Sequence, residues 1–72
     1  MNYKFYKEIE PLLKPELQGL GENQWRYFCY HRKYRSWQTY TPDSTTKRVI
    51  FSLVKRGLLK VNHETRQARY VE

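Results

Sequence analysis

The chain has 72 residues, 39% hydrophobic and 17% aromatic, which fits one small folded domain and excludes wholesale disorder. Fourteen Lys and Arg face seven Asp and Glu, a formal charge of +7, and the lone cysteine excludes an internal disulfide framework. Charges in every turn of MNYKFYKEIEPLLK exclude a signal peptide and a membrane span. We expect a single domain, residues 1–72, in the cytoplasm.

The positive charge is unevenly distributed. Residues 1–24 hold three Lys and four Glu, whereas residues 25–72 hold eleven basic and three acidic residues. Such a concentration of one sign attracts a polyanion, and nucleic acid is the favoured candidate. A membrane partner is not expected, because no stretch pairs a strongly apolar face with a Lys/Arg face. A merely solubilising surface is the alternative.

The first third of the chain predicts one helix and a short turn. A helix is expected over about residues 2–10, followed by a second turn or short helix from Pro11, because proline fits the first turn of a helix. Gly19 and Gly21 then break the chain. Apolar side chains recur in this segment at a helical spacing: Phe5, Ile9, Leu12, Leu13 and Leu17.

The stretch ENQWRYFCYHRKYRSW predicts a second helix with Asn23 as its N-cap. Residues at i, i+3, i+4 and i+7 should form the core face of this helix: Trp25, Phe28, Cys29 and Arg32. Three tyrosines fall on its flank: Tyr27, Tyr30 and Tyr34. The segment SWQTYTPD, residues 36–43, is typical of a connection.

A third helix should begin after a cap at Asp43 or Ser44 and run to about Arg56, where Gly57 stops it. Its buried stripe should comprise Thr46, Ile50 and Leu53, with Val49 and Val54 at the edges. Two strand-like runs follow, LLKV and ARYV, separated by the polar NHETRQ as in a hairpin. The chain is therefore expected to be mainly α with a small β-hairpin.

The other face of the third helix is polar and basic: Thr45, Lys47, Arg48, Ser52, Lys55 and Arg56. No acid occurs from Ser44 to Leu59, although a typical surface helix mixes both signs of charge. Such a helix suits the major groove, where Lys and Arg reach guanine edges or phosphates. The N-terminus of the helix adds donors that suit a phosphate.

These residues resemble a family. TTKRVIFSLVKRGLLKV resembles the recognition helix and first wing strand of winged helix-turn-helix DNA-binding domains, and ARYVE is similar to the returning wing strand. The resemblance covers about residues 43–71 and implies a winged helix, with three helices and a two-stranded wing. Before Asp43 the segment RKYRSWQTYTP departs from the pattern, because it lacks a well-formed middle helix with a small-residue turn. An abbreviated or distorted helix-turn-helix is therefore expected.

The resemblance implies a set of DNA-contacting residues. Thr45, Lys47, Arg48 and Ser52 match the groove-facing surface of the recognition helix, with Lys55 on the same face. Ser44 lies at the start of the helix and is expected to cap it or touch phosphate. The wing would contribute His63, Arg66 and Arg69 along the backbone or in the minor groove.

Aromatic and basic residues alternate between Trp25 and Tyr40. The favoured interpretation is that Tyr34, Arg35 and Tyr40 reach phosphates at the start of the third helix. A stacking platform for single strands and a protein-binding surface are the alternatives. Packing explains a further set of aromatic residues better: Trp25, Phe28 and Phe51.

No constellation of residues predicts catalysis, a metal site or a cofactor, so an enzyme is not expected. The leading hypothesis is sequence-specific binding of double-stranded DNA, by a small transcriptional regulator or an architectural factor in replication or recombination. The rival hypothesis is a winged-helix module that binds or inhibits a protein. A small module should bind DNA as a homodimer or in several copies, with the near-neutral N-terminal segment as the self-association surface. A whole gene product of this size suggests a phage or mobile-element regulator, nucleoid-associated in a bacterial cell.

Overall fold

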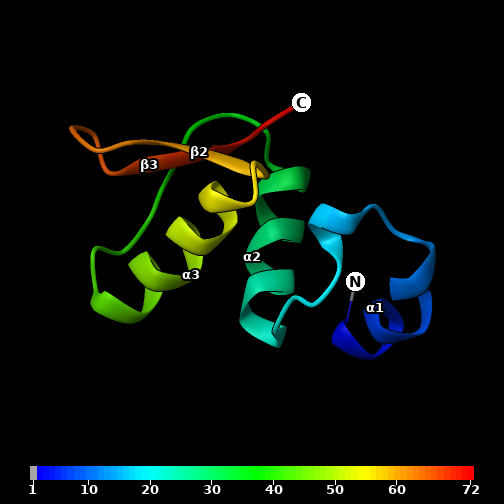
Figure 1. The fold of residues 1–72 in the computed structure, drawn as a ribbon. Helices are drawn as coiled ribbons and strands as arrows, with labels where there is room; N and C mark the ends of the chain where they lie inside the picture. The colour runs from blue at the N-terminus through cyan, green and yellow to red at the C-terminus, as the bar shows by residue number, and fades with distance from the viewer. Residues whose placement is uncertain (1) are drawn as a thin grey trace.

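Two helices of 12 residues each form the centre of the fold: α2 (Glu22–Lys33) and α3 (Ser44–Lys55). The computed structural model describes residues 2–72. The short helix α1 (Tyr3–Ile9) packs beside α2 at one end of the molecule, and a β-hairpin covers the other end beyond α3 (Figure 1). The domain is therefore mainly helical with a small sheet, as the sequence predicts. No helix among residues 2–72 is long and apolar enough to cross a membrane.

The N-terminal segment turns twice at proline. Asn2 caps α1 by accepting a hydrogen bond from the N–H of Phe5 at 2.8 Å. Two 3-10 turns follow, η1 (Glu10–Leu12) and η2 (Pro15–Leu17), each with a proline in its first turn. The helical spacing therefore does not continue past α1. Leu12 is 85% exposed and Phe5 44%, whereas Tyr6 is fully buried.

Helix α2 differs from its prediction in two respects. It begins at Glu22, one residue before the predicted cap Asn23, and the side chain of Gln24 accepts a hydrogen bond from the N–H of Gly21 at 2.7 Å. On the predicted core face, Trp25 and Phe28 are buried, but Arg32 is exposed. The neighbouring His31 is buried instead, with 2% of its surface exposed. The face in contact with the core is thus rotated relative to the prediction.

Helix α3 agrees closely with its prediction. The Asp43 carboxylate caps it by accepting a hydrogen bond from the N–H of Thr46 at 2.7 Å. The predicted stripe is buried at Thr46, Ile50 and Leu53. Gly57 ends the helix in the left-handed region, with φ of 79°, and the N–H of Leu58 donates to the carbonyl oxygen of Leu53 at 3.0 Å. Glycine suits this Schellman-type turn because it has no Cβ to strain the backbone.

The hairpin pairs β2 (Leu59–Asn62) antiparallel with β3 (Gln67–Tyr70), with Leu59 opposite Tyr70 and Asn62 opposite Gln67. A third strand, β1 (Gln38–Thr39), pairs with the other edge of β3 and gives the order β1-β3-β2. This strand lies where the sequence predicts a connection. It is two residues long, which is too short for an alternating pattern of apolar and polar residues. It forms because β3 has a free edge with which it can pair.

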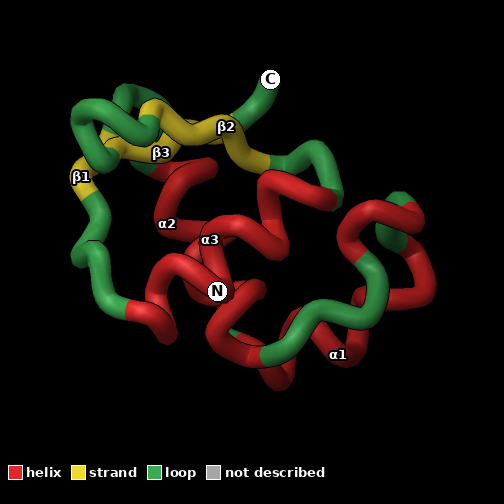
Figure 2. The backbone as a smooth tube through the Cα atoms, turned by 60° about the vertical axis from the view of Figure 1, so that its left-hand side comes forward, coloured by secondary structure: helices red, strands yellow, loops and turns green. Residues whose placement is uncertain are grey.

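Ten residues, 34–43, join α2 to α3 and hold no helix. Figure 2 shows this connection running from β1, beside the hairpin, to the start of α3. A helix-turn-helix motif joins its two helices by three or four residues. The long connection therefore agrees with the predicted departure from that pattern.

The core is rich in aromatic rings. Tyr6 stacks on Trp25 with centroids 4.3 Å apart, and Trp25 stacks on Phe28 at 5.7 Å. The core links all the main elements through its buried residues: Tyr6, Leu20, Trp25, Phe28, Tyr40, Ile50, Leu53, Leu59 and Ala68. Phe51, which the sequence assigned to packing, is 38% exposed and contacts the ring of His63.

Candidate nucleic-acid interface

The outward face of α3 carries the largest group of sequence-predicted site residues. Five of them are exposed there: Ser44, Thr45, Lys47, Arg48 and Lys55. Within residues 2–72, neither Lys47 nor Arg48 takes part in an ion pair. Their charges are therefore directed to solvent, because the apolar stripe on the opposite side fixes the rotation of the helix about its axis.

Ser52 does not lie on this exposed face. It is half-buried, and its hydroxyl donates to the carbonyl oxygen of Val49 at 2.6 Å and accepts from the side chain of Gln24 at 2.8 Å. The second bond ties α3 to α2. Because both helices approach each other here, the structure corrects the expected groove-facing position of Ser52.

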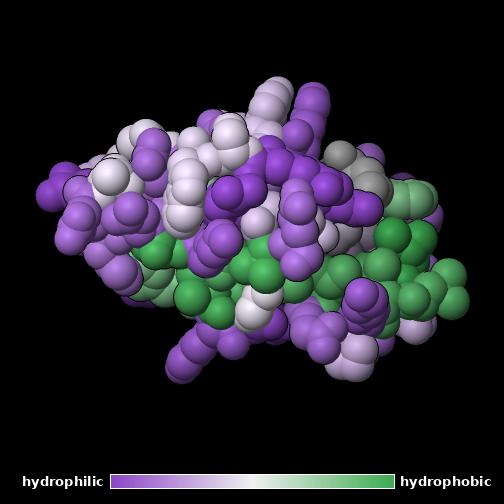
Figure 3. Space-filling model, turned by 90° about the horizontal axis from the view of Figure 1, so that it is seen from above, coloured by the Kyte–Doolittle hydropathy of each residue, from purple (hydrophilic) through white to green (hydrophobic). Residues whose placement is uncertain are grey.

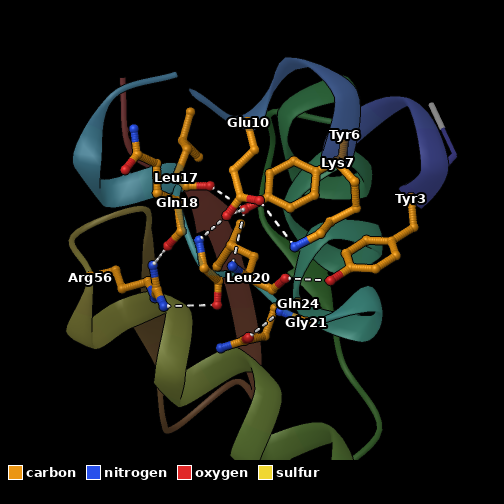
Figure 4. Close-up of polar contacts among 11 residues, drawn as sticks. Tyr3, Tyr6, Lys7, Glu10, Leu17, Gln18, Leu20, Gly21, Gln24 and Arg56 are labelled. Atoms are coloured by element: carbon orange, nitrogen blue, oxygen red, sulfur yellow. Dashed lines mark hydrogen bonds and ion pairs between the residues drawn. The ribbon is translucent and has the colours of Figure 1, made fainter. Parts of the chain in front are cut away.

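Arg56 is also turned away from the exposed face. Its guanidinium donates to the carbonyl oxygens of Glu16 at 3.2 Å and Gln18 at 2.6 Å, and more weakly to that of Gly19 at 3.5 Å. Figure 4 shows this group reaching from the end of α3 to the segment after η2. Arg56 is therefore a structural clamp between the C-terminal end of α3 and residues 16–19.

The hairpin brings further basic residues beside α3. His63 and Arg66 are exposed in its turn, whereas Lys60 lies opposite Arg69 on the sheet face away from the buried Leu59. The rings of His63 and Phe51 lie 5.6 Å apart, so the hairpin turn is in contact with the outward face of α3. Figure 1 shows the hairpin projecting past α3 on that side. The two groups of residues thus form one surface, called here the α3–hairpin surface: Thr45, Lys47, Arg48, Lys55, His63 and Arg66.

Arg69 occupies a more enclosed position. It is half-buried on β3, with its guanidinium over the ring of Trp37 at 5.8 Å, and its Nε atom is buried without a hydrogen-bond partner. Arg69 therefore packs on the β1 side of the sheet.

The electrostatics of the α3–hairpin surface are one-sided. No acid occurs from residue 44 to residue 63. Asp43, just before the helix, is engaged as its cap, and hydrogen bonds from the side chain and backbone of Thr46 hold the pKa of its carboxyl below the usual value. Its charge thus stabilises the start of α3 at neutral pH. Glu64 in the hairpin turn is the one acid between Asp43 and Glu72.

The predicted phosphate-contacting group of Tyr34, Arg35 and Tyr40 is dispersed. Tyr40 is 7% exposed and belongs to the core, and its N–H donates to the carbonyl oxygen of Arg66 at 3.0 Å. Tyr34 and Arg35 follow the C-terminal end of α2, far from the start of α3 (Figure 1). Arg35 lies 3.4 Å from the Glu72 carboxylate, with its guanidinium 5.2 Å from the centroid of Tyr70. These positions correct the expectation that the three residues meet at the start of α3.

An exposed aromatic surface does exist near that end of α2. It consists of three residues that are 45%, 46% and 37% exposed: Tyr30, Tyr34 and Trp37. The rings of Tyr30 and Tyr34 lie 5.0 Å apart, and the Lys33 ammonium lies 5.4 Å from the Tyr34 centroid.

No pattern along the chain indicated that His31 would be buried. Its Nδ1 atom is buried and has no hydrogen-bond partner, and burial lowers the pKa of the imidazole from its ordinary value of 6.5. Burial also raises the pKa of the Cys29 thiol. Among residues 2–72, no three His, Cys, Asp or Glu side chains are grouped to hold a metal ion.

The chain matches no protein-family model, and comparisons with curated proteins and with solved structures found no match.

Proposed function

We propose that this protein binds double-stranded DNA in the manner of a winged helix, with α3 in the major groove and the hairpin on the backbone. The observation that carries the proposal is the continuity of the α3–hairpin surface. Its exposed cations come from two elements that the contact between Phe51 and His63 holds together.

The dimensions of α3 suit this role. A 12-residue helix is about 18 Å long, and with side chains about 10–12 Å wide, which matches a major groove about 12 Å wide. The hydroxyl of Thr45 and the charges of Lys47 and Arg48 lie in the first two turns, which recognition helices direct at base edges. Arg66 would then neutralise a phosphate beside the groove.

The order of elements also supports a winged-helix arrangement. The hairpin begins two residues after Gly57, and β1 pairs with β3 to give the order β1-β3-β2. The protein would serve as a small transcriptional regulator or as an architectural factor in replication or recombination.

A protein-binding function is the second candidate, and the exposed aromatic surface favours it. Tyr and Trp are frequent anchors of protein interfaces, and Tyr30, Tyr34 and Trp37 all remain accessible. Salt dependence separates the two functions. Four to six phosphate contacts predict a log–log salt slope of roughly −4 to −5, whereas a protein-binding module should bind DNA little at physiological salt.

The test is a titration of a labelled mixed-sequence duplex at several salt concentrations. Lys47→Ala with Arg48→Ala should weaken binding at least about tenfold and reduce the salt slope by about 2. The matched control is Lys4→Ala with Arg26→Ala, which removes the same two charge types from exposed positions outside the α3–hairpin surface. Equal losses in both double variants, or no binding of the unmodified protein at low salt, would overturn the proposal.

A further inference from the structure

An apolar groove lies on the face of the molecule opposite to the start of α3. It has a volume of about 550 Å³, and one wall comes from residues 12–17. Figure 3 shows the apolar side chains on this face as a continuous band, with hydrophilic residues on both sides. The apolar lining is formed by Leu12, Leu13, Leu17, Phe28, Leu58 and Val71. Leu12 is 85% exposed at its edge.

The outward position of Leu12 is fixed by the backbone around it. The N–H of Leu13 donates to the carbonyl oxygen of Glu10 at 3.1 Å, and the side chain of Gln18 donates to the carbonyl oxygen of Leu13 at 2.9 Å. Arg56 holds the carbonyls of Glu16 and Gln18. Leu12 is thus a rigid apolar projection beside an apolar hollow, and these are the two halves of a self-complementary contact.

The charges around the groove select the partner. The groove lining carries two cations and two acids: Lys14, Glu16, Arg32 and Glu72. A partner with charges of one sign, whether a nucleic acid or a strongly acidic or basic protein, would meet like charges here. A second copy offers the same balanced pattern. Because residues 1–24 carry four acids against three bases in a chain of charge +7, two copies also repel each other least through this region.

We infer that two copies of the chain associate through this groove about a two-fold axis, with Leu12 of each copy inserted into the groove of the other. In this arrangement Glu16 of one copy pairs with the oppositely charged Arg32 of the second copy, and because a two-fold contact is isologous the pair occurs twice. The groove lining contains none of Thr45, Lys47 or Arg48, so both α3–hairpin surfaces stay free. The inference does not depend on the DNA-binding proposal.

The test is sedimentation equilibrium over a range of protein concentrations without DNA. The unmodified chain should approach twice its monomer mass of 8.9 kDa. Leu12→Asp should raise the dimer Kd at least about tenfold, since it places a charge in an apolar contact, while the exposed position leaves the thermal midpoint unchanged. The matched control is Phe5→Asp, which alters an apolar residue of α1 that is 44% exposed and lies outside the groove, and it should leave the dimer intact.

A charge exchange tests the two-fold pairing. Glu16→Arg should weaken the dimer, because it faces Arg32 of the second copy, and the double variant Glu16→Arg with Arg32→Glu should restore it. A monomeric unmodified protein at every concentration, or a Leu12→Asp variant that dimerises normally, overturns the inference. A double variant that stays as weak as Glu16→Arg overturns the pairing. Failure of DNA binding leaves this result untouched.

Discussion

The N-terminal segment and the α3–hairpin region use their side chains in opposite ways. In residues 2–24 the polar groups bind one another: the Glu10 carboxylate accepts hydrogen bonds from Lys7 at 3.0 Å and from the N–H of Gly19, and the Tyr3 hydroxyl donates to the carbonyl oxygen of Leu20 at 2.9 Å (Figure 4). That segment leaves Leu12 exposed. In α3, by contrast, Ile50 and Leu53 are buried, and three cations are exposed: Lys47, Arg48 and Lys55. The first region is therefore suited to an apolar contact and the second to a polyanion.

The two regions share one core, and Leu53 lies in it with no exposed surface. Leu53→Ala should lower the free energy of unfolding by about 2–5 kcal/mol, through lost burial and the cavity left behind. Urea denaturation monitored by circular dichroism measures this loss. Val54→Ala, a half-buried neighbour, is the control and should cost less. A loss below about 1 kcal/mol at Leu53 would show that the regions do not depend on this shared core.

Arg56 connects the N-terminal segment to α3. Its removal should therefore destabilise residues 16–19 without altering the hairpin. Arg56→Ala should cost about 1–2 kcal/mol, because the guanidinium donates to backbone carbonyls that it leaves unpaired. Hydrogen exchange should then increase at residues 16–19 more than in β2 and β3. Lys55→Ala, which removes an exposed neighbouring cation, is the control. Equal increases in hydrogen exchange at residues 16–19 and in β2 and β3 would contradict this local role of Arg56.

His31 lies in α2 between the two regions, and its protonation should make the stability of the fold depend on pH. Burial lowers its folded-state pKa below 6.5, so the unfolded chain binds the proton more readily. Stability should be complete above pH 6.5 and fall as the pH drops from there toward the lower folded-state pKa. Thermal melts between about pH 8 and pH 5 measure this loss. His31→Gln should flatten the curve in that window, and an unchanged curve would contradict the assigned cause.

The smallest effect is expected at Arg66, which has φ of 55° in the hairpin turn. Arg66→Gly should preserve the turn, because glycine adopts this conformation without strain. It should also remove the proposed phosphate contact and reduce the salt slope by about 1. Arg66→Ala removes the same charge but should also destabilise the hairpin. Thermal melts measure the stability of the two variants. Equal stability would contradict the left-handed conformation of Arg66.

Local signals predicted the α3–hairpin region well. The Asp43 cap, the stripe of Ile50 and Leu53, and the stop at Gly57 depend on residues within one or two turns of each other, and the structure confirms all of them. The N-terminal segment was predicted less well. There the apolar spacing indicated Phe5, which is 44% exposed, whereas Tyr6 is buried against Trp25 of α2.

The predicted site shows the same division. Lys47, Arg48 and Lys55 lie on the exposed face, because the stripe that fixes the rotation of α3 is readable along the chain. Ser52 fits the same helical pattern but meets Gln24 of α2, 28 residues away. Tyr40 and Arg35 were grouped by their proximity in sequence. In the structure β1 lies between them and pairs with β3, so the two residues occupy different parts of the fold.

The sequence by itself determined the uneven distribution of charge, the bounds of α3 and the hairpin after it, since charge is additive and caps and turns act over a few residues. Tertiary structure decided the remaining features. It paired β1 with β3, buried His31 and Tyr40, bound Arg56 to residues 16–19 and left Leu12 outside. Each of these outcomes depends on what a distant segment offers: a free strand edge, an apolar surface or an unpaired carbonyl. A side chain's own residue type does not specify that partner.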